Sequence, residues 1–470
     1  MIWNFNDYHK NIAVVTESND QITYEKLQKE TEELAVHIGK RCLVFSFCTN
    51  TMGSLAGYTA CLNHKIVPLL LDSHLDKEFI EDLAKEYRPA YFWLPEEMQM
   101  GFVDLMPVYK SSGYVLLKTE YDCGYELNDM LALLLTTSGS TGSPKLVRQS
   151  YENIKANMEA IAEYLEIDEN ERPITTLPMS YTYGLSIINS HLCKGAAIIM
   201  TEKSLLQKEF WEQLKTFAAT SFGGVPYTYE MLNKLRFFQM DLPSLKIMTQ
   251  AGGKLSPELH KKFAEYAIEK NKRFVVMYGQ TEATARMSYL PYNKSLEKYG
   301  SMGIAIPHGR FALQDENGDF ISEPHVVGEL VYYGKNVTLG YAECGEDLKK
   351  GDERHGVLLT GDMAKFDEDG YYYIVGRKKR FLKIFGKRIN LDETEHLLKQ
   401  HFGYMDFACA GKDDKMYIFL IDSEISQDVK RFIAEKTGLN SIAFKVKQIE
   451  SIPKNDAGKT IYADLVKFYD

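Results

Sequence analysis

Short apolar segments alternate with segments of helical spacing in the first part of the chain, and this alternation restricts the possible folds most strongly. Residues 24–42 carry apolar side chains at helical spacing, the helix pattern ends near Gly39, and the apolar run Leu43 to Phe47 follows. A further helix-like segment precedes the apolar run Ile66 to Leu71, and a helix is also predicted over residues 151–164. Such alternation is typical of layered α/β folds with a largely parallel sheet. The sequence therefore predicts an α/β fold.

Length, charge and cysteine usage limit the function classes. A chain of 470 residues, 45% hydrophobic and 26% charged, can bury large cores and should form at least two domains. The net charge of −10 and the pI of about 5.7 argue against a nucleic-acid-binding protein. The seven cysteines are scattered without zinc-binding spacing, which favours a reducing cytoplasm. Neither a secretion signal nor an apolar run of about 18 residues is found, so no membrane span is expected.

The segment Thr137 to Lys145, TSGSTGSPK, combines three features that suit a polyphosphate ligand. Gly139 and Gly142 allow the backbone to approach a ligand closely. The hydroxyl side chains and successive N–H groups of the loop can bind an anion, and Lys145 adds a positive charge. The segment is not a Walker loop, because it lacks the G-x-x-x-x-G-K-[ST] spacing. A Gly/Ser hairpin or linker is the alternative interpretation.

Thr137 to Lys145 resembles the phosphate loop of the AMP-forming adenylating enzymes, which include acyl-CoA synthetases, aryl-CoA ligases, firefly luciferases and the adenylation domains that load carrier proteins. Motifs similar to those of this superfamily continue over nearly the whole chain. The resemblance implies ATP and Mg²⁺ as cofactors, and coenzyme A or the phosphopantetheine of a carrier protein as the acyl acceptor. The residues of this loop expected to bind ATP are Thr137, Ser138, Gly139, Ser140, Thr141, Gly142 and Lys145.

The segment Thr249 to Leu255, TQAGGKL, resembles the glycine pair of the superfamily that contacts adenine. The resemblance implies that the backbone at Gly252 and Gly253 lies flat against the purine. A tight turn between a strand and a loop is the alternative interpretation, since glycine is frequent in such turns.

The segment Val275 to Ala283, VVMYGQTEA, resembles a second nucleotide-binding motif of the superfamily. A short apolar strand ends in Tyr278, whose ring is expected to stack on adenine, and Thr281 is expected to contact the α-phosphate. Glu282 is the expected magnesium ligand, because Mg²⁺ in nucleotide sites binds one or two carboxylates besides phosphate oxygens and waters. The other nucleotide-binding residues expected in this motif are Gly279 and Gln280.

Leu177 to Ser186, LPMSYTYGLS, and Phe222 to Tyr229, FGGVPYTY, resemble acyl-binding segments of the superfamily. Tyr181 stands where acyl-activating relatives carry a histidine. Thr182 stands where α-amino-acid activators carry an aspartate, and threonine cannot neutralise a buried ammonium. The expected substrate is therefore a small to medium carboxylic acid without an α-ammonium group; the alternative is that Tyr181 and Tyr183 are core aromatics. The expected acyl-pocket residues are Tyr181, Thr182, Tyr183, Val225, Pro226 and Tyr227.

The segment Leu358 to Arg377 resembles the ribose-binding segment of the superfamily. The resemblance implies that Asp362 accepts hydrogen bonds from both ribose hydroxyls, as a carboxylate can with its two oxygens. Arg377 is expected to hold the ribose and phosphate end of the nucleotide. A turn aspartate is the alternative interpretation, although Asp367 and Asp369 fit that role better.

Two motifs near the C-terminus imply a mobile domain. Gly376 to Glu395 resembles the hinge of the superfamily, with Lys379 at the pivot and Arg388 among the nucleotide-binding residues. A solvated basic surface is the alternative interpretation of this charge-rich segment. Pro453 to Lys459, PKNDAGK, implies that Lys459 is a mobile catalytic lysine.

Together these motifs imply a large N-terminal multi-layer α/β domain, residues 1–378, and a small C-terminal α+β lid domain, residues 379–470. The implied reaction activates a carboxylic acid to an acyl-adenylate with release of pyrophosphate and then transfers the acyl group to a thiol. Lys459, Thr281 and Glu282 are the expected catalytic residues. The alternatives are an amino-acid-activating enzyme that serves a separate carrier protein, a non-catalytic acyl or nucleotide binder, and a luciferase-like oxygenase.

Overall fold

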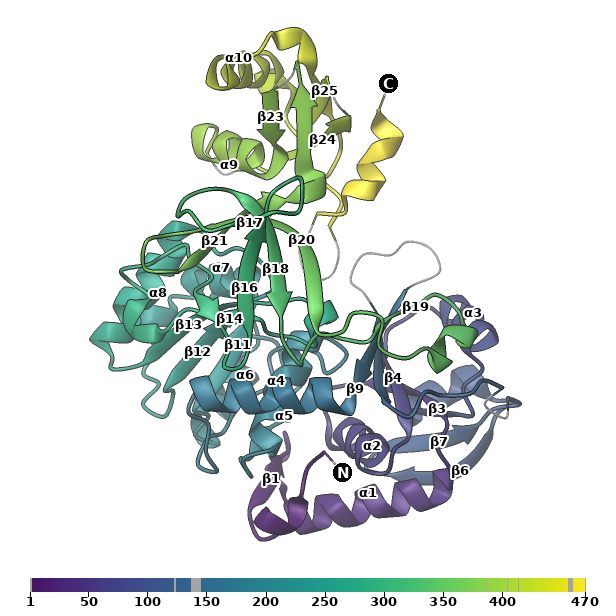
Figure 1. Ribbon diagram of the computed structural model, residues 1–470. Helices are drawn as coiled ribbons and strands as arrows, with labels where there is room; N and C mark the ends of the chain where they lie inside the picture. The colour runs from purple at the N-terminus through teal and green to yellow at the C-terminus, as the bar shows by residue number, and fades with distance from the viewer. Residues whose placement is uncertain are drawn as a thin grey trace. The chain divides into compact units, whose positions relative to one another are not determined.

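We describe the fold from a computed structural model of the chain (Figure 1). The structure describes residues 2–121, 124–136, 145–385, 387–403, 405–412, 414–454 and 460–469, and describes only the backbone at residues 379, 381, 383, 387 and 388. The chain forms two compact units, Met1–Phe311 with Tyr332–Leu358 and Ala312–Val331 with Leu359–Asp470. The pivot predicted at Lys379 lies within the second unit, and the point about which a lid would move stays a prediction.

The first unit contains a mixed eight-stranded sheet. In spatial order its strands are β19 (Gly340–Ala342), β9 (Leu146–Ser150), β8 (Leu131–Thr136), β4 (Val67–Asp72), β3 (Leu43–Cys48), β5 (Tyr91–Pro95), β7 (Tyr114–Lys118) and β6 (Met106–Ser111). The pairs β3/β4, β3/β5 and β4/β8 are parallel, whereas the outer pairs are antiparallel. The prediction of a largely parallel sheet is therefore confirmed for the four central strands.

The central strands are apolar on both sides because helices cover both faces of this sheet. All six residues of β3 are buried. Leu43 and Phe45 pack with α3 (Lys77–Tyr87), whereas Val44 packs with α1 (Tyr24–Ile38) and α2 (Met52–Asn63). Since successive side chains of a strand point to opposite faces, a continuous apolar run is what burial on both faces requires.

Local sequence signals set the ends of two predicted helices. α1 ends at Gly39, whose φ of 78° is a backbone conformation that glycine adopts readily. α4 (Tyr151–Tyr164) begins with a capping box, in which the Ser150 Oγ accepts from the Asn153 N–H at 3.0 Å and the Asn153 Oδ1 accepts from the Ser150 N–H at 2.8 Å. The helix predicted over residues 151–164 is confirmed.

A second sheet of the first unit brings the predicted adenine-binding motifs to one edge. Its strands, in spatial order, are β11 (Ser221–Gly224), β12 (Ile247–Gln250), β13 (Arg273–Tyr278), β14 (Ser288–Tyr289) and β15 (Ile304–Ala305), and the first three are parallel. The segments after β12 and β13 therefore leave the sheet at the same edge, which is where ligands bind in α/β proteins. A third sheet is formed by β10 (Ile198–Ile199), β1 (Ile12–Val15) and β2 (Gln21–Thr23). The remaining helices are α5 (Thr182–Leu192), α6 (Lys208–Thr216), α7 (Pro226–Lys234) and α8 (Pro257–Glu269).

The second unit has a mixed α and β composition. A five-stranded sheet that falls mostly in this unit has the order β17 (Phe320–Ile321), β16 (Arg310–Gln314), β18 (Gly328–Tyr333), β20 (Val357–Phe366) and β21 (Tyr372–Arg377). The remainder consists of the hairpin β22 (Phe381–Ile384) and β23 (Lys387–Asn390), the sheet of β24 (Ala408–Lys412), β25 (Lys415–Leu420) and β26 (Phe444–Gln448), and the helices α9 (Leu391–His401) and α10 (Ser426–Thr437). Across the described parts of both units, no helix is long and apolar enough to cross a membrane.

A buried histidine on α5 should make the stability of the fold depend on pH. His191 is 5% exposed, and burial lowers its pKa from 6.5 to about 4. Between these pH values the unfolded chain binds a proton that the folded chain does not, so the free energy of unfolding should fall as the pH drops from 6.5 to 4. The loss attributable to His191 should be on the order of 3 kcal/mol.

Urea unfolding at several pH values measures this dependence. His191→Gln should unfold with a smaller change in free energy between pH 6.5 and pH 4 than the wild type. Burial also lowers the pKa of His260 to about 4, so adding His260→Gln should flatten the dependence further. An unaltered pH dependence in both variants would contradict the expectation.

Candidate active site

The predicted phosphate loop connects two paired strands. Residues 137–144 lie outside the described residues, and so do the predicted site residues Thr137, Ser138, Gly139, Ser140, Thr141 and Gly142. Thr136 at the end of β8 pairs with Leu146 at the start of β9, so the two ends of the segment are held together. Both strands are buried in the eight-stranded sheet and hold these ends firmly.

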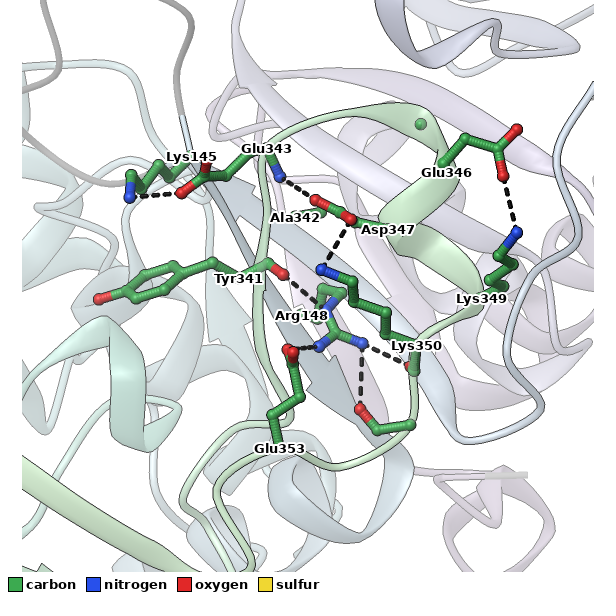
Figure 2. Close-up of polar contacts among 12 residues, drawn as sticks. Lys145, Arg148, Tyr341, Ala342, Glu343, Glu346, Asp347, Lys349, Lys350 and Glu353 are labelled. Atoms are coloured by element: carbon green, nitrogen blue, oxygen red, sulfur yellow. Dashed lines mark hydrogen bonds and ion pairs between the residues drawn. The ribbon is translucent and has the colours of Figure 1, made fainter.

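Lys145, the last residue of the predicted loop, lies against a segment from far along the chain. Its Nζ forms an ion pair with the carboxylate of Glu343 and lies 5.8 Å from the centroid of the Tyr341 ring (Figure 2). β19 brings these residues there, because Tyr341 pairs with Val147 and Ala342 with Leu146. Tyr341 and Glu343 thus join the predicted site, although sequence reasoning assigned neither of them a role.

Arg148 anchors this segment to β9. Its side chain is 0% exposed, donates from Nε to the Tyr341 carbonyl at 3.0 Å and from Nη1 to the Lys350 carbonyl at 2.5 Å, and pairs with Glu353 (Figure 2). A buried guanidinium that binds several carbonyls and a carboxylate holds a loop rigidly, because its donors lie in a fixed plane. The backbone at Tyr341 is therefore held in place by Arg148 and by the pairing of β19 with β9.

Tyr341 links Lys145 to the predicted magnesium ligand. Its hydroxyl donates to the Glu282 Oε1 at 2.7 Å. Burial and the neighbouring Glu282 carboxylate raise the pKa of Tyr341 to about 12, so the phenol stays protonated and can donate. The guanidinium carbon of Arg354 lies 4.6 Å from the centroid of the same ring, and its Nη1 donates to the Glu282 carbonyl at 3.0 Å. Two motifs that lie far apart in the sequence thus meet at one tyrosine.

The predicted adenine-binding residues follow β12 and β13. Gly252 has a φ of 82°, and its neighbour Gly253 accepts a hydrogen bond at 2.9 Å from the Gln250 side chain. Tyr278 ends β13, and its hydroxyl accepts from the Gln280 side chain at 3.1 Å. Thr281 opens the 3₁₀ turn η4 (Thr281–Ala283), which also carries Glu282. These residues share the edge of the second sheet at which a ligand is expected.

Gly279 lies where no side chain fits, and its replacement should therefore disturb this edge. A Cβ at this position would lie 1.7 Å from the Ala285 carbonyl oxygen, so Gly279→Ala must displace the backbone between Tyr278 and Thr281. Because a displacement of about 1 Å at a reacting centre can lower a rate about a hundredfold, we expect a loss of ATP–pyrophosphate exchange of that order. Gly101→Ala is the matched control, since no heavy atom lies within 4 Å of the added Cβ. Equal exchange rates in the two variants would contradict this expectation.

The six predicted acyl-pocket residues do not all lie together. Tyr183, Val225 and the partly buried Tyr181 belong to one apolar cluster, and the Tyr183 hydroxyl is hydrogen bonded to the Thr249 Oγ1 at 2.8 Å. Thr182 donates its hydroxyl to the Thr284 carbonyl.

The other two predicted acyl-pocket residues lie at the start of α7. Pro226 is its first residue, and Tyr227 is 55% exposed and lines a hollow of about 190 Å³ with Phe210 and Met231. Tyr181 and Val225 therefore lie near Gly252, because a Cβ there would lie 2.6 Å from the Tyr181 hydroxyl and 3.0 Å from the Val225 Cγ1, whereas Tyr227 lines a different hollow.

The second unit pairs the two predicted ribose-binding residues. Asp362 on β20 is 3% exposed, and its Oδ1 lies 2.7 Å from the Nε of Arg377, the residue opposite on β21. Lys379 falls in the 3₁₀ turn η7 (Lys378–Arg380), and Arg388 in β23. Lys459 lies outside the described residues. The Asp367 Oδ1 accepts hydrogen bonds from the Asp369 and Tyr371 N–H groups in the turn that follows β20. Asp367 is therefore a turn aspartate, as the sequence suggested.

Sequence comparisons find a family and several relatives. The family described as AMP-binding enzyme matches residues 3–342. An oxalate–CoA ligase of Arabidopsis thaliana is 28% identical over 346 residues, which are 70% of this chain and 65% of that protein. A 2-succinylbenzoate–CoA ligase of Staphylococcus epidermidis is 24% identical over 460 residues, which are 95% of this chain and 93% of that protein. This chain therefore spans just under two thirds of the first relative and nearly all of the second.

Solved structures share the fold. An o-succinylbenzoate CoA synthetase from Bacillus subtilis, in complex with the acyl-adenylate OSB-AMP, superposes with a TM-score of 0.77 at 20% identity and covers 97% of this chain and 95% of that chain. ATP-bound MatB from Rhodopseudomonas palustris superposes with a TM-score of 0.78 at 21% identity and covers 99% of this chain and 96% of that chain. These likenesses establish the α/β fold with a large N-terminal and a smaller C-terminal domain.

Proposed function

Because this chain belongs to the AMP-binding enzyme family, we propose that it is an AMP-forming acid–thiol ligase. The observation that carries the proposal is the meeting of Lys145 and Glu282 at Tyr341, which brings a phosphate-binding cation and a metal-binding carboxylate into one site. Lys145 comes from the predicted phosphate loop and Glu282 from the second predicted nucleotide-binding motif. The reaction of ATP requires both a cation for the phosphates and a carboxylate for the metal.

The reaction has two steps. In the first, a carboxylate oxygen of the acid attacks the α-phosphorus of ATP, the bond from that phosphorus to the bridging oxygen breaks, and pyrophosphate leaves. In the second, a thiol attacks the acyl carbonyl, the bond to AMP breaks, and the thiol proton passes to solvent. The first step brings two anions together, so positive charge and positioning supply most of its catalysis.

The charge and the position of each residue determine which part of ATP or of the acid we assign to it. We assign the β- and γ-phosphates to Lys145 and the loop before it, the α-phosphate to Thr281, and the bridge between the acid and the α-phosphate to Lys459. The adenine lies against Tyr278 and the glycine pair, and the ribose against Asp362 and Arg377. The Glu343 carboxylate, which pairs with Lys145 in the structure, must release the lysine when the phosphates arrive.

Glu282 fits magnesium. Tyr341 holds one carboxylate oxygen, and the other has no hydrogen-bond partner among the described residues. Mg²⁺ in nucleotide sites binds one or two carboxylates and otherwise phosphate oxygens and waters, so one free carboxylate oxygen is sufficient. When bound, the ion neutralises charge on the departing pyrophosphate.

The acid substrate should lack an α-ammonium group, because Thr182 is neutral and its hydroxyl is already used by the Thr284 carbonyl. The acceptor is coenzyme A, since the relatives that match this chain are CoA ligases. A separate carrier protein is the second candidate partner, and an amino-acid-activating enzyme is the second candidate function. We place the reaction in the cytoplasm, where ATP and coenzyme A are available.

ATP–pyrophosphate exchange with a panel of carboxylic and amino acids tests this proposal. We expect exchange with at least one carboxylic acid, and a thioester detected by mass spectrometry when coenzyme A is added. Exchange with an α-amino acid above that with its deaminated analogue would instead favour the amino-acid-activating enzyme. If no acid supported exchange, the chain would be a non-catalytic binder.

A further inference from the structure

Arg286 is a buried cation surrounded by neutral groups. It is 2% exposed, its Nε donates to the Ser186 Oγ at 3.1 Å, and its Nη1 donates to the Tyr164 hydroxyl at 3.1 Å. Its guanidinium carbon lies 5.2 Å from the centroid of the Tyr183 ring. Burial raises the pKa of both Tyr164 and Tyr183, so neither phenol supplies a negative charge. The positive charge of Arg286 is therefore not neutralised by the side chains that hold it.

The other buried arginines in the described part of the chain are neutralised. Three arginines are buried among the described residues, and two of them contact carboxylates: Arg148 pairs with Glu353, and Arg380 pairs with Glu395 at 2.6 Å. No carboxylate of a described residue lies within 4 Å of the Arg286 guanidinium. Arginine does not lose its proton in proteins, and an uncompensated buried charge is strongly unfavourable. No described carboxylate therefore neutralises Arg286, and an anion from outside the chain would do so.

A strained turn precedes Arg286. Thr284 has φ and ψ of 66° and −53°, and the Ala285 N–H donates to the Ala283 carbonyl at 2.7 Å, which closes a tight turn of three residues. Positive φ is unfavourable for a β-branched residue, and such conformations persist where the surroundings enforce them.

Two buried asparagines hold the turn in place. The Asn336 Nδ2 donates to the Ala283 carbonyl at 2.9 Å, and the Asn157 Nδ2 donates to the Arg286 carbonyl at 2.8 Å. The backbone thus fixes the arginine before any ligand binds, as expected of a group that recognises charge.

The guanidinium borders the predicted acyl pocket. Tyr183, whose ring it faces, and Thr182, one turn before Ser186 on α5, were both assigned to that pocket from the sequence. Thr182, Ser186 and Ala285 line a hollow of about 10 Å³, which holds about one water. A substrate group therefore reaches Arg286 only when pocket side chains move, as happens on binding in many complexes.

We propose that Arg286 binds a second carboxylate of the acid substrate, so that the enzyme activates one end of a dicarboxylic acid and holds the other. This inference rests on the proposed acid-activating function. An anion at Arg286 would form charge-assisted hydrogen bonds with a guanidinium that is already in position. A monocarboxylic acid of the same length would leave the cation uncompensated and should bind more weakly.

Matched pairs of diacids and their monomethyl esters test the proposal, because each ester keeps one carboxylate and nearly the same shape. The pairs are succinate, glutarate, adipate and phthalate with their monomethyl esters, and the readout is kcat/KM for ATP–pyrophosphate exchange. The wild type should prefer at least one diacid over its ester. Arg286→Met, which keeps the length of the side chain but not its charge, should lower that preference on the order of a hundredfold.

The outcomes separate this inference from the proposed function. If the wild type activates the esters or simple monoacids as well as the diacids, the inference is wrong and the function stands. If no acid supports exchange, both fail. If Arg286→Met lowers kcat/KM equally for diacid and ester, the arginine acts on the reacting carboxylate or on the fold.

Thermal unfolding distinguishes a structural role. Arg286→Met should lower the unfolding temperature only slightly, because loss of a buried charge that has no carboxylate partner offsets the lost hydrogen bonds to the Ser186 and Tyr164 hydroxyls. Arg148→Met is the matched comparison: it should lower the unfolding temperature, since the Tyr341, Lys350 and Gly351 carbonyls lose their donor. If both variants lowered the unfolding temperature equally, the assignment of Arg286 to substrate binding would be wrong.

Discussion

Alanine at position 459 is expected to slow acyl-adenylate formation on the order of a hundredfold to a thousandfold, because it removes a positive charge where two anions must meet. The substrate carboxylate and the α-phosphate repel each other, and Lys459 is the residue of the motif Pro453 to Lys459 that we assign to both. Thioester formation from preformed acyl-adenylate should be nearly unaffected, because a mobile domain would carry the lysine away before the thiol attacks.

Lys454→Ala is the matched control for this experiment. Lys454 lies five positions earlier in the same motif, but its Nζ is 2.6 Å from the Asp406 Oδ2, so it already serves a contact within the second unit. Pyrophosphate exchange measures the first step, and release of AMP from synthetic acyl-adenylate in the presence of coenzyme A measures the second. If Lys459→Ala slowed both steps equally, the prediction that the C-terminal domain carries Lys459 away between the two steps would be wrong.

The elements that the sequence predicts well are those with local signals. The helix over residues 151–164 matches the structure because the Ser150 and Asn153 side chains define its start, and α1 ends at the glycine where the pattern ends. The parallel strands β3 and β4 are recognisable because burial on both faces requires an unbroken apolar run. In each case the residues that determine the helix end or the buried strand lie within or next to that element.

The contacts that the sequence does not predict arise from pairing between distant segments. Tyr341 reaches Glu282 and Lys145 only because β19 pairs with β9, and neither strand carries a signal that specifies this partner. Arg286 follows a recognised motif directly, but the unpaired state of its charge is visible only when all of its neighbours are known. The place of Tyr227 in the pocket stays a prediction, since adjacent residues at the start of a helix such as α7 can face different surfaces.

Replacement of Glu282 by glutamine is expected to lower ATP–pyrophosphate exchange on the order of a hundredfold and to raise the magnesium concentration needed for half-maximal rate. Glutamine has the same shape and can still accept from the Tyr341 hydroxyl, so the site should keep its geometry and lose only the charge that binds the cation. Titration of the exchange rate with MgCl₂ at saturating ATP measures both effects.

Tyr341→Phe separates the charge of Glu282 from its orientation. The variant keeps the ring between Lys145 and Arg354 but removes the hydroxyl that donates to the Glu282 Oε1, so the carboxylate stays charged and becomes free to rotate. A lost hydrogen bond to a charged group corresponds to about 1.5–3 kcal/mol, which predicts a decrease of roughly ten- to a hundredfold with a smaller change in magnesium dependence than in Glu282→Gln. If Glu282→Gln left the magnesium dependence of the wild type unchanged, the metal would be bound elsewhere, and the link from Lys145 through Tyr341 to Glu282 would only stabilise the fold.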